Sequence, residues 1–150
     1  MQKQVTKSII VKGNPSKAFE VWTNFEDFPK FMKHIKSVIK TGQNTSRWVV
    51  ELPGAGKLEW EAETTMLEPE TRIGWSSKDR GDFTTSGQTT FTSLPKEDQT
   101  QVTVTFQFST KSDEMLNGET IDAFELILEE DLRNYKAYVE GMDSRLPKEQ

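Results

Sequence analysis

Residues 24–35 read NFEDFPKFMKHI, a short segment that is rich in phenylalanine. A strand-like segment and a short helical pattern precede it, and strand-like segments follow it until one long helical pattern closes the chain. So many aromatic side chains are unusual in a surface connection, because apolar groups gain stability when they leave water. We therefore predict short helical turns folded over an apolar interior, where they form a wall or lid of a pocket.

The composition limits the classes of protein to consider. The 150-residue chain has a net charge of -5 and no cysteine. This length predicts one domain, residues 1–150. Nucleic acid is not expected as a partner, because phosphates bind basic faces. The lack of cysteine excludes disulfides and thiolate metal sites. No apolar run approaches the ~20 residues of a membrane span, so we expect a cytoplasmic protein without stable membrane insertion.

Two predicted elements come before the aromatic segment. Residues 5–11 alternate between two faces, which predicts a strand with at least one buried face. Asn14 is a good N-cap residue, and Pro15 suits the first helical position. A helix is therefore predicted over residues 15–22.

The segments after it alternate with a period of two, which is typical of strands. They lie at residues 35–41, 46–52, 57–67, 71–78, 84–93 and 101–108. One face of the clearest of them carries Leu58, Trp60, Ala62, Thr64 and Met66. Its other face is acidic, as expected for an antiparallel strand that is wet on one side.

The last helix is predicted over about residues 119–140, a length of about 30 Å at 1.5 Å per residue. Its apolar stripe consists of Ile121, Phe124, Leu128, Leu132, Tyr135, Val139 and Met142. The order of elements predicts an α+β fold, a curved antiparallel sheet of about seven strands around the C-terminal helix, with two short helices between the first two strands. A bent sheet packed on a helix leaves space between the two layers.

Several short segments also match a known family, in the right order along the chain. They are residues 8–11, Pro15, residues 19–22, 27–31, Trp60, and residues 69–75, 87–91, 101–104 and 131–140. On these segments the chain resembles the START/SRPBCC (helix-grip, Bet v 1-like) superfamily, in its polyketide cyclase/dehydrase and coenzyme Q-binding branch. The resemblance covers nearly the whole chain and implies a single helix-grip domain. It does not choose among the carriers, cyclases and regulators of that superfamily.

We expect a ligand-binding cavity of roughly 300–1,000 Å³ between the sheet and the C-terminal helix. The residues predicted to line it are Phe28, Phe31, Met32, His34, Trp60, Thr64, Trp75, Thr89, Phe91, Phe106 and Tyr135.

The resemblance also raises the question of catalysis. The aromatase/cyclases that the chain resembles are thought to use a polar tyrosine near the short helices together with inward arginines, and His34 stands at the tyrosine position. Arg47 and Arg72 alternate with Trp48 and Ile73, so we predict that both arginines face solvent. His34 is then the only candidate catalytic residue, and it also fits an exposed loop. With one histidine and no cysteine, we expect no metal site and no cofactor.

The sequence is compatible with three functions. The leading hypothesis is a binding or carrier protein for an apolar or aromatic small molecule, such as a lipid, an isoprenoid quinone or a polyketide-like compound. The alternative is an enzyme of the polyketide cyclase/dehydrase type, for which the sequence supplies few acid–base groups, so a role as an enzyme is not favoured. The third is a regulator that binds a protein partner, for which the acidic face at Glu59, Glu61 and Glu63 suits a basic surface.

Overall fold

The computed structural model describes residues 2–52, 56–78, 83–95, 98–110 and 118–145. The helices in these residues are α1 (Pro15–Thr23), the short 3-10 helix η1 (Phe25–Lys30) and α2 (Gly118–Arg145). The strands are β1 (Gln2–Lys12), β2 (Ile35–Lys40), β3 (Thr45–Leu52), β4 (Gly56–Glu68), β5 (Arg72–Ser77), β6 (Phe83–Leu94) and β7 (Gln99–Thr110).

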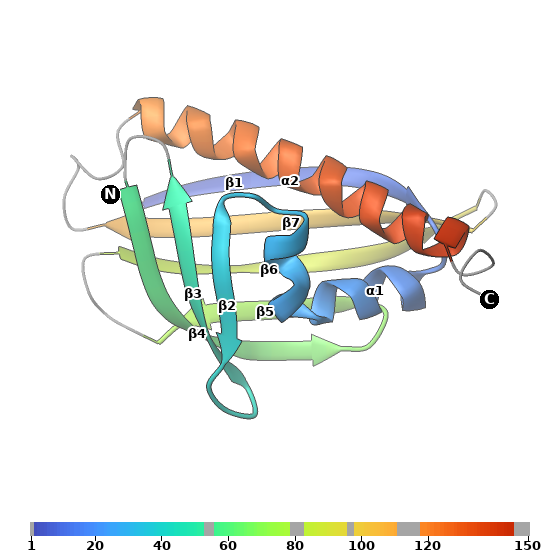
Figure 1. The fold of residues 1–150 in the computed structure, drawn as a ribbon, viewed down its shortest axis with the longest axis horizontal. Coiled ribbons are helices and arrows are strands. Elements are labelled where there is room, and N and C mark those ends of the chain that lie inside the picture. The colour runs from blue at the N-terminus through green and yellow to red at the C-terminus, as the bar shows by residue number, and fades with distance from the viewer. Residues whose placement is uncertain (1, 53–55, 79–82, 96–97, 111–117, 146–150) are drawn as a thin grey trace.

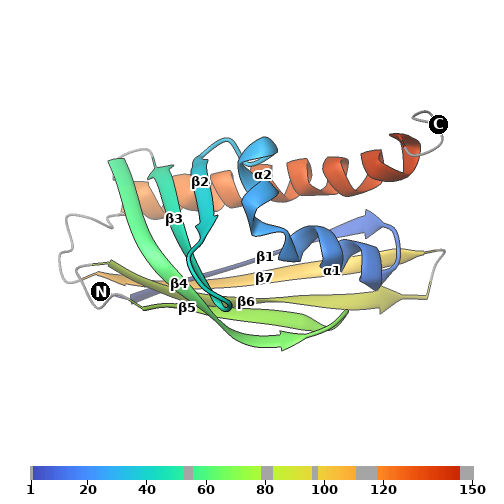
Figure 2. The same cartoon turned by 60° about the horizontal axis from the view of Figure 1, so that its bottom comes forward.

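The strands form one antiparallel sheet in the order β1-β7-β6-β5-β4-β3-β2. The first strand therefore pairs with the last, and α1 and η1 connect β1 to β2 at the other edge. Helix α2 runs along β1 and β7 (Figure 1), and the sheet curls so that β2, β3 and β4 rise toward the helix (Figure 2). This arrangement confirms the predicted α+β helix-grip fold, with short helices between the first two strands.

Helix α1 begins where the sequence predicts. Asn14 has an extended backbone, and its side-chain oxygen accepts a hydrogen bond from the Lys17 N–H at 3.0 Å. Pro15 occupies the first helical position, where no backbone donor is needed. An N-cap of this kind contributes about 1 kcal/mol. The buried face of the helix consists of Ala18, Val21 and Trp22.

The aromatic segment forms η1 and the turn that follows it. The Phe31 and Met32 N–H groups both donate to the Phe28 carbonyl, at 3.1 and 2.8 Å, and so keep the turn tight. Phe28 and Met32 are buried. The Phe28 ring also meets Trp22 and Trp48 edge-on, at centroid distances of 5.3 and 5.8 Å. The short helical turns over an apolar interior are therefore confirmed.

Two β-bulges help to bend the far side of the sheet. The pairing of β2 with β3 shifts between Ile35 and Ser37, and the pairing of β4 with β5 shifts between Thr64 and Met66. A bulge adds one residue on one strand, bends that strand and increases its twist. Beyond its bulge, Met66 pairs with Gly74. The residues on either side of Gly74, Ile73 and Trp75, face inward, so Gly74 and its partner Met66 are on the outer face. The prediction that Met66 shares the inner face with Leu58 is therefore wrong, because the extra residue reverses the alternation.

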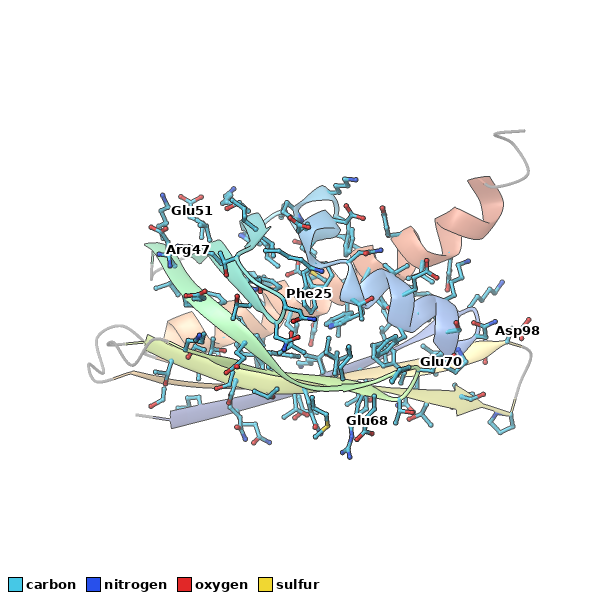
Figure 3. All side chains as sticks on the ribbon, turned by 90° about the horizontal axis from the view of Figure 1, so that it is seen from below. Phe25, Arg47, Glu51, Glu68, Glu70 and Asp98 are labelled. Carbon is cyan, nitrogen blue, oxygen red and sulfur yellow. The ribbon has the colours of Figure 1, made fainter. Side chains whose placement is uncertain are left out.

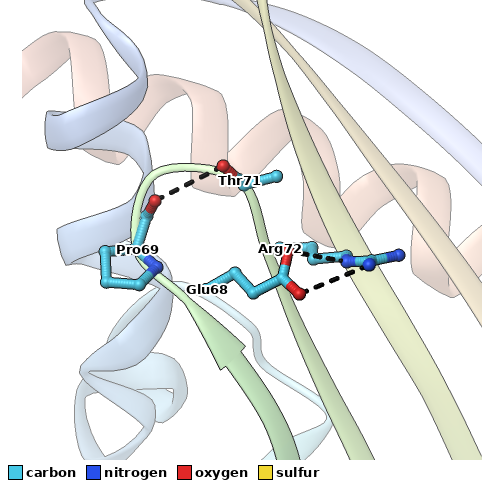
Figure 4. Close-up of polar contacts among 4 residues, drawn as sticks. All are labelled: Glu68, Pro69, Thr71 and Arg72. Atoms are coloured by element: carbon cyan, nitrogen blue, oxygen red, sulfur yellow. Dashed lines mark hydrogen bonds and ion pairs between the residues drawn. The ribbon is translucent and has the colours of Figure 1, made fainter.

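The turn between β4 and β5 is closed by its own side chains (Figure 4). The Arg72 guanidinium donates to both carboxylate oxygens of Glu68, at 3.0 and 3.3 Å, and the Thr71 hydroxyl donates to the Pro69 carbonyl at 3.4 Å. Glu70 adopts a left-handed backbone conformation, with a φ of 64°. The paired charges are exposed and so contribute little stability, but they hold Arg72 on the outer face of the sheet.

Helix α2 packs on the sheet through the predicted stripe. Leu132, Tyr135 and Val139 are buried, whereas Phe124 and Leu128 are partly buried. The side chains of Ile121 and Met142, predicted at the ends of the stripe, lie outside the described residues. On the other side of the contact, Lys7 reaches from β1 to Glu129 and Glu125, at 2.7 and 3.4 Å. The hydrogen bond from Lys7 lowers the pKa of Glu129 and raises the pKa of the lysine itself.

Candidate functional site

A cavity of about 120 Å³ lies between the bent part of the sheet and α2, with η1 beside it. Its walls come from segments far apart in the sequence, because the curl of the sheet brings β3 and β4 over the helix. The lining is mostly apolar and consists of Trp22, Phe25, Phe28, Met32, His34, Ile35, Ser46, Trp48, Val50, Leu58, Trp60, Ala62, Thr64, Trp75, Val104, Phe106, Phe108, Phe124, Ile127, Leu128 and Asp131.

The structure brings many of the predicted residues together at this cavity. Those that line it are Phe28, Met32, His34, Trp60, Thr64, Trp75 and Phe106. They come from η1 and the turn after it and from strands β4, β5 and β7. The period-two pattern could predict the strand residues among them, because each lies on the inner face of the sheet.

Two predicted aromatic residues pack elsewhere. Phe31 points toward the end of α2, where its ring stacks on Tyr138 with centroids 4.6 Å apart. Phe91 is buried against α1, where Phe19 and Trp22 meet its ring edge-on at 5.4 and 6.5 Å. Neither lines the cavity, because α1 and the end of α2 already fill the space in front of them.

Tyr135 and Thr89 are the other two predicted residues that lie outside the cavity. The Tyr135 hydroxyl donates to the backbone carbonyl of Ala18 at 2.7 Å and is fully buried. Burial raises the pKa of this phenol above its usual value. The tyrosine therefore joins α2 to α1 rather than facing a ligand. Thr89 is also fully buried, within the packed part of the sheet.

The cavity is smaller than the sequence-based expectation of roughly 300–1,000 Å³. The reason is that aromatic rings occupy much of the space. Phe25 contacts Phe28 and Trp48 with centroids 5.8 Å from each. Phe124 from α2 contacts Phe106 and Phe108 at 5.1 Å. Rings on both sides thus reduce the gap between sheet and helix to a short cavity.

Parallel indoles form one wall of the cavity. Trp48 on β3 and Trp60 on β4 are direct partners in the sheet, and their rings are parallel within 3°, with centroids 6.3 Å apart. The Trp48 Nε1–H donates to the Ser46 hydroxyl at 2.8 Å, which fixes the orientation of the ring. Flat aromatic faces favour flat aromatic partners, in stacked or edge-on contacts. The two indoles can therefore contact an aromatic group in the cavity.

A second wall depends on a close backbone approach. Trp75 on β5 lies over Gly87 of β6, and a Cβ atom at position 87 would come within 2.8 Å of the indole. The same Cβ atom would lie even closer to the Thr105 carbonyl oxygen, so a side chain there would clash with the backbone of β7 as well as with Trp75. Gly87 therefore lets the Trp75 ring lie close to the sheet, where it contacts Phe106 with centroids 5.8 Å apart.

Asp131 is the functional candidate that sequence reasoning missed. It lies on the inner face of α2, lines the cavity and is only 6% exposed. Its Oδ1 atom is buried without a hydrogen-bond partner among the described residues. Burial raises the pKa of the carboxyl to about 7; Glu130 adds to the shift and Lys33 opposes it. The available signal was an acidic residue that falls on the apolar stripe, seven residues after Phe124 and four before Tyr135.

The remaining polar groups of the lining are few. His34 is partly buried, and Ser46 and Thr64 supply hydroxyls from β3 and β4. His34 and Asp131 are the titratable side chains of the lining in the part of the chain that the structure describes. Among the described residues, no group of three or more histidine, aspartate or glutamate side chains could hold a metal ion.

The strand arginines face away from the cavity, as predicted. Arg47 contacts Glu59 at 3.7 Å on the outer face, and Arg72 contacts Glu68. Figure 3 shows Arg47 and Glu51 pointing away from the interior, whereas Phe25 lies between the layers. The cavity therefore receives no positive charge from these strands.

A curved antiparallel sheet that grips a long helix over an apolar cavity defines the START/SRPBCC superfamily, so the resemblance predicted from sequence is confirmed. Residues 2–140 match the family model described as "Polyketide cyclase / dehydrase and lipid transport". The chain belongs to this family.

Similar proteins agree with this assignment. An uncharacterised 17.2 kDa protein of Streptomyces lincolnensis is 28% identical over 137 residues, which cover 91% of this chain and 89% of that protein. A solved structure from Deinococcus radiodurans is 27% identical, with a TM-score of 0.73, and the match covers 92% of this chain and 97% of that one. A Streptomyces aromatase/cyclase has the same fold, with a TM-score of 0.71 at 19% identity, over 97% of this chain and 95% of that one.

Neither α1 nor the described part of α2 is long and apolar enough to cross a bilayer.

Proposed function

We propose that this protein binds a small apolar or aromatic molecule in the cavity between the sheet and α2, as a carrier or binding protein. The observation that carries the proposal is the cavity itself, whose walls are aromatic and aliphatic side chains from β3, β4, β5, β7 and α2. Binding of an apolar ligand in an apolar cavity is favourable, because it removes apolar surface from water.

The size of the cavity restricts the ligand. At about 120 Å³, it suits a compact ring system better than a long acyl or isoprenoid chain. A long chain would require rings such as Phe25 and Phe124 to move, or would extend beyond the cavity. The ligand class is therefore a compact aromatic compound, and lipids and long-chain quinones are less suited.

A second candidate is an enzyme of the cyclase/dehydrase type. The observation in its favour is that two titratable side chains, His34 and Asp131, line the same cavity. A histidine, and a carboxyl with a pKa near 7, are both suited to proton transfer. This candidate requires turnover in addition to binding. Measuring conversion of a poly-ketone beside affinity for it separates the two functions.

The test is native mass spectrometry of freshly purified protein, followed by a thermal-shift panel of compact aromatic compounds. We expect a co-purified small molecule or a saturable increase in melting temperature. The variant Ala62→Leu extends a side chain from the inner face of β4 into the cavity and should abolish both signals. Leu126→Ala, on an exposed residue of α2, is the matched control and should keep them. Lack of binding by every compound would contradict the proposal.

A further inference from the structure

The buried carboxyl of Asp131 has no established role in the fold. It forms no hydrogen bond through Oδ1 among the described residues, and it interrupts the apolar face of α2 between Leu128 and Leu132. A buried polar group without a partner is destabilising. Because the side chain lies on the cavity wall, a bound ligand can supply that partner.

We propose that the Asp131 carboxyl, in its protonated form, donates a hydrogen bond to a carbonyl or phenol oxygen of a flat aromatic ligand that packs against Trp48 and Trp60. This inference rests on the proposed function and names the chemical class of its ligand. The two indoles line the cavity from the sheet, and the carboxyl lines it from the helix. A planar ring with one oxygen substituent can therefore contact both walls at once.

Burial is the main cause that favours the protonated form of Asp131, and the charged groups around it act in opposite directions. Glu130 is its neighbour on α2, and Lys33 lies in the turn between η1 and β2. Lys33 is bound to Glu130 at 3.4 Å, so its charge is already partly compensated. His34 lines the cavity from the same turn. Because desolvation is the largest effect, the pKa of Asp131 is raised to about 7 and the side chain is a donor below that pH.

A neutral acid suits a dry aromatic cavity better than an ion does. An ionised carboxylate there would need a buried cation, and none of the lysine or arginine side chains in the described residues lines the cavity. A neutral carboxyl needs only an acceptor, and a ketone or phenol oxygen supplies one at a low desolvation cost. A ligand held through its carbonyl oxygen should therefore bind more weakly as the pH rises and the carboxyl ionises.

The test uses three probes on one ring system, namely 2-acetylnaphthalene, 2-ethylnaphthalene and 2-naphthylmethylamine. Calorimetric titrations of the wild-type protein are run at pH ~5.5 and ~8.5, on either side of the carboxyl titration. At the lower pH, the ketone should bind about tenfold more tightly than the hydrocarbon, as one hydrogen bond permits. At the higher pH this preference should disappear, while the hydrocarbon binds almost equally at both.

Three variants assign the effect to Asp131. Asp131→Leu should bind the ketone and the hydrocarbon equally at both pH values. Asp131→Asn keeps a donor that does not titrate, so it should prefer the ketone at both. His34→Gln should retain the wild-type pH dependence, because His34 is the other titratable group of the lining.

The titrations separate failure of the Asp131 inference from failure of ligand binding. A ketone preference that survives in Asp131→Leu, or a pH dependence that is lost in His34→Gln, would overturn the inference while leaving ligand binding intact. Tighter binding of the amine than of the ketone at the higher pH would assign the ionised carboxyl to cation recognition and would equally overturn it. Failure of all three probes to bind any form would instead count against the proposed function.

Discussion

The space between the sheet and α2 has two halves that are packed very differently. In the filled half, Tyr135 is fully buried, its hydroxyl donates to Ala18 at 2.7 Å and Trp22 meets its ring edge-on at 5.0 Å. In the open half, one to three turns earlier on the same helix, a cavity remains between Trp60 and Asp131. The same elements thus make a close-packed core at one end and a hollow at the other.

The close packing of one half allows this small fold to keep a cavity in the other. A hollow of about 120 Å³ between the layers is destabilising, because the side chains around it make fewer packing contacts. A marginally stable protein tolerates this only when the rest of its core is well packed. The filled half supplies that packing, with Val11, Val102 and Val139 almost fully buried around Tyr135.

The largest expected effect is in the filled half. Leu132→Ala should lower the free energy of unfolding by about 2–5 kcal/mol, because Leu132 is 2% exposed and its neighbours cannot close the gap. Urea denaturation measures the change. Leu126→Ala on the exposed face of the same helix should stay within about 0.5 kcal/mol. Similar losses in the two variants would show that the filled half is not the stable core.

The next effect is in the open half and depends on pH. Between about pH 4 and pH 7, the folded protein holds a proton on Asp131 that the unfolded chain, with the usual pKa of 3.8, has released. The free energy of unfolding therefore falls as the pH rises through this window, by up to about 4 kcal/mol. Asp131→Asn should remove that part of the pH dependence.

Denaturation curves recorded from acid to mildly alkaline pH would measure this pH dependence of the free energy of unfolding. Asp122→Asn changes an exposed carboxylate on the same helix and should follow the wild-type curve. If Asp131→Asn and the wild type lose stability in parallel between pH ~4 and ~7, the carboxyl is not desolvated in the folded protein.

A smaller effect belongs to the contact between the two helices. Tyr135→Phe removes the hydroxyl that donates to the Ala18 carbonyl and should lower the free energy of unfolding by about 1–3 kcal/mol, because that buried carbonyl loses its side-chain partner. Thermal denaturation with a fitted enthalpy measures it. Ligand affinity should not change, since Tyr135 does not line the cavity. A large loss of affinity would contradict the separation of the two halves.

The smallest effect is expected at His34. The side chain is partly buried at the edge of the cavity, so His34→Ala should change the affinity for a neutral aromatic ligand less than tenfold. Affinity and conversion of a poly-ketone are measured side by side. A turnover that is present in the wild type and falls at least ~100-fold in the variant, while binding persists, would favour the enzyme.

These two halves also explain what sequence could predict. The period-two faces of the strands, the Asn14–Pro15 helix start and the stripe on α2 were sufficient for the architecture, because each is a local pattern that the fold preserves. Sequence could not separate Tyr135 from Trp60, because both are aromatic residues on an inner face. Only the three-dimensional position of α1 shows which of them is covered.

Two further failures have local causes. The bulge after Thr64 turns Met66 to the other face of the sheet, and no residue type in that strand predicts a bulge. Asp131 was overlooked because acidic residues on helices are usually solvated, and its burial depends on the sheet curling over α2.

A methyl NMR titration with 2-acetylnaphthalene tests most directly whether a ligand binds in the open half and leaves the filled half unchanged. The ligand should cause saturable shifts at the methyl groups of Val50, Leu58 and Ile127, which line the cavity. The methyl groups of Val11, Val102 and Val139 in the filled half should not shift. Shifts confined to exposed methyl groups such as those of Leu126, or spread equally over both halves, would contradict the account.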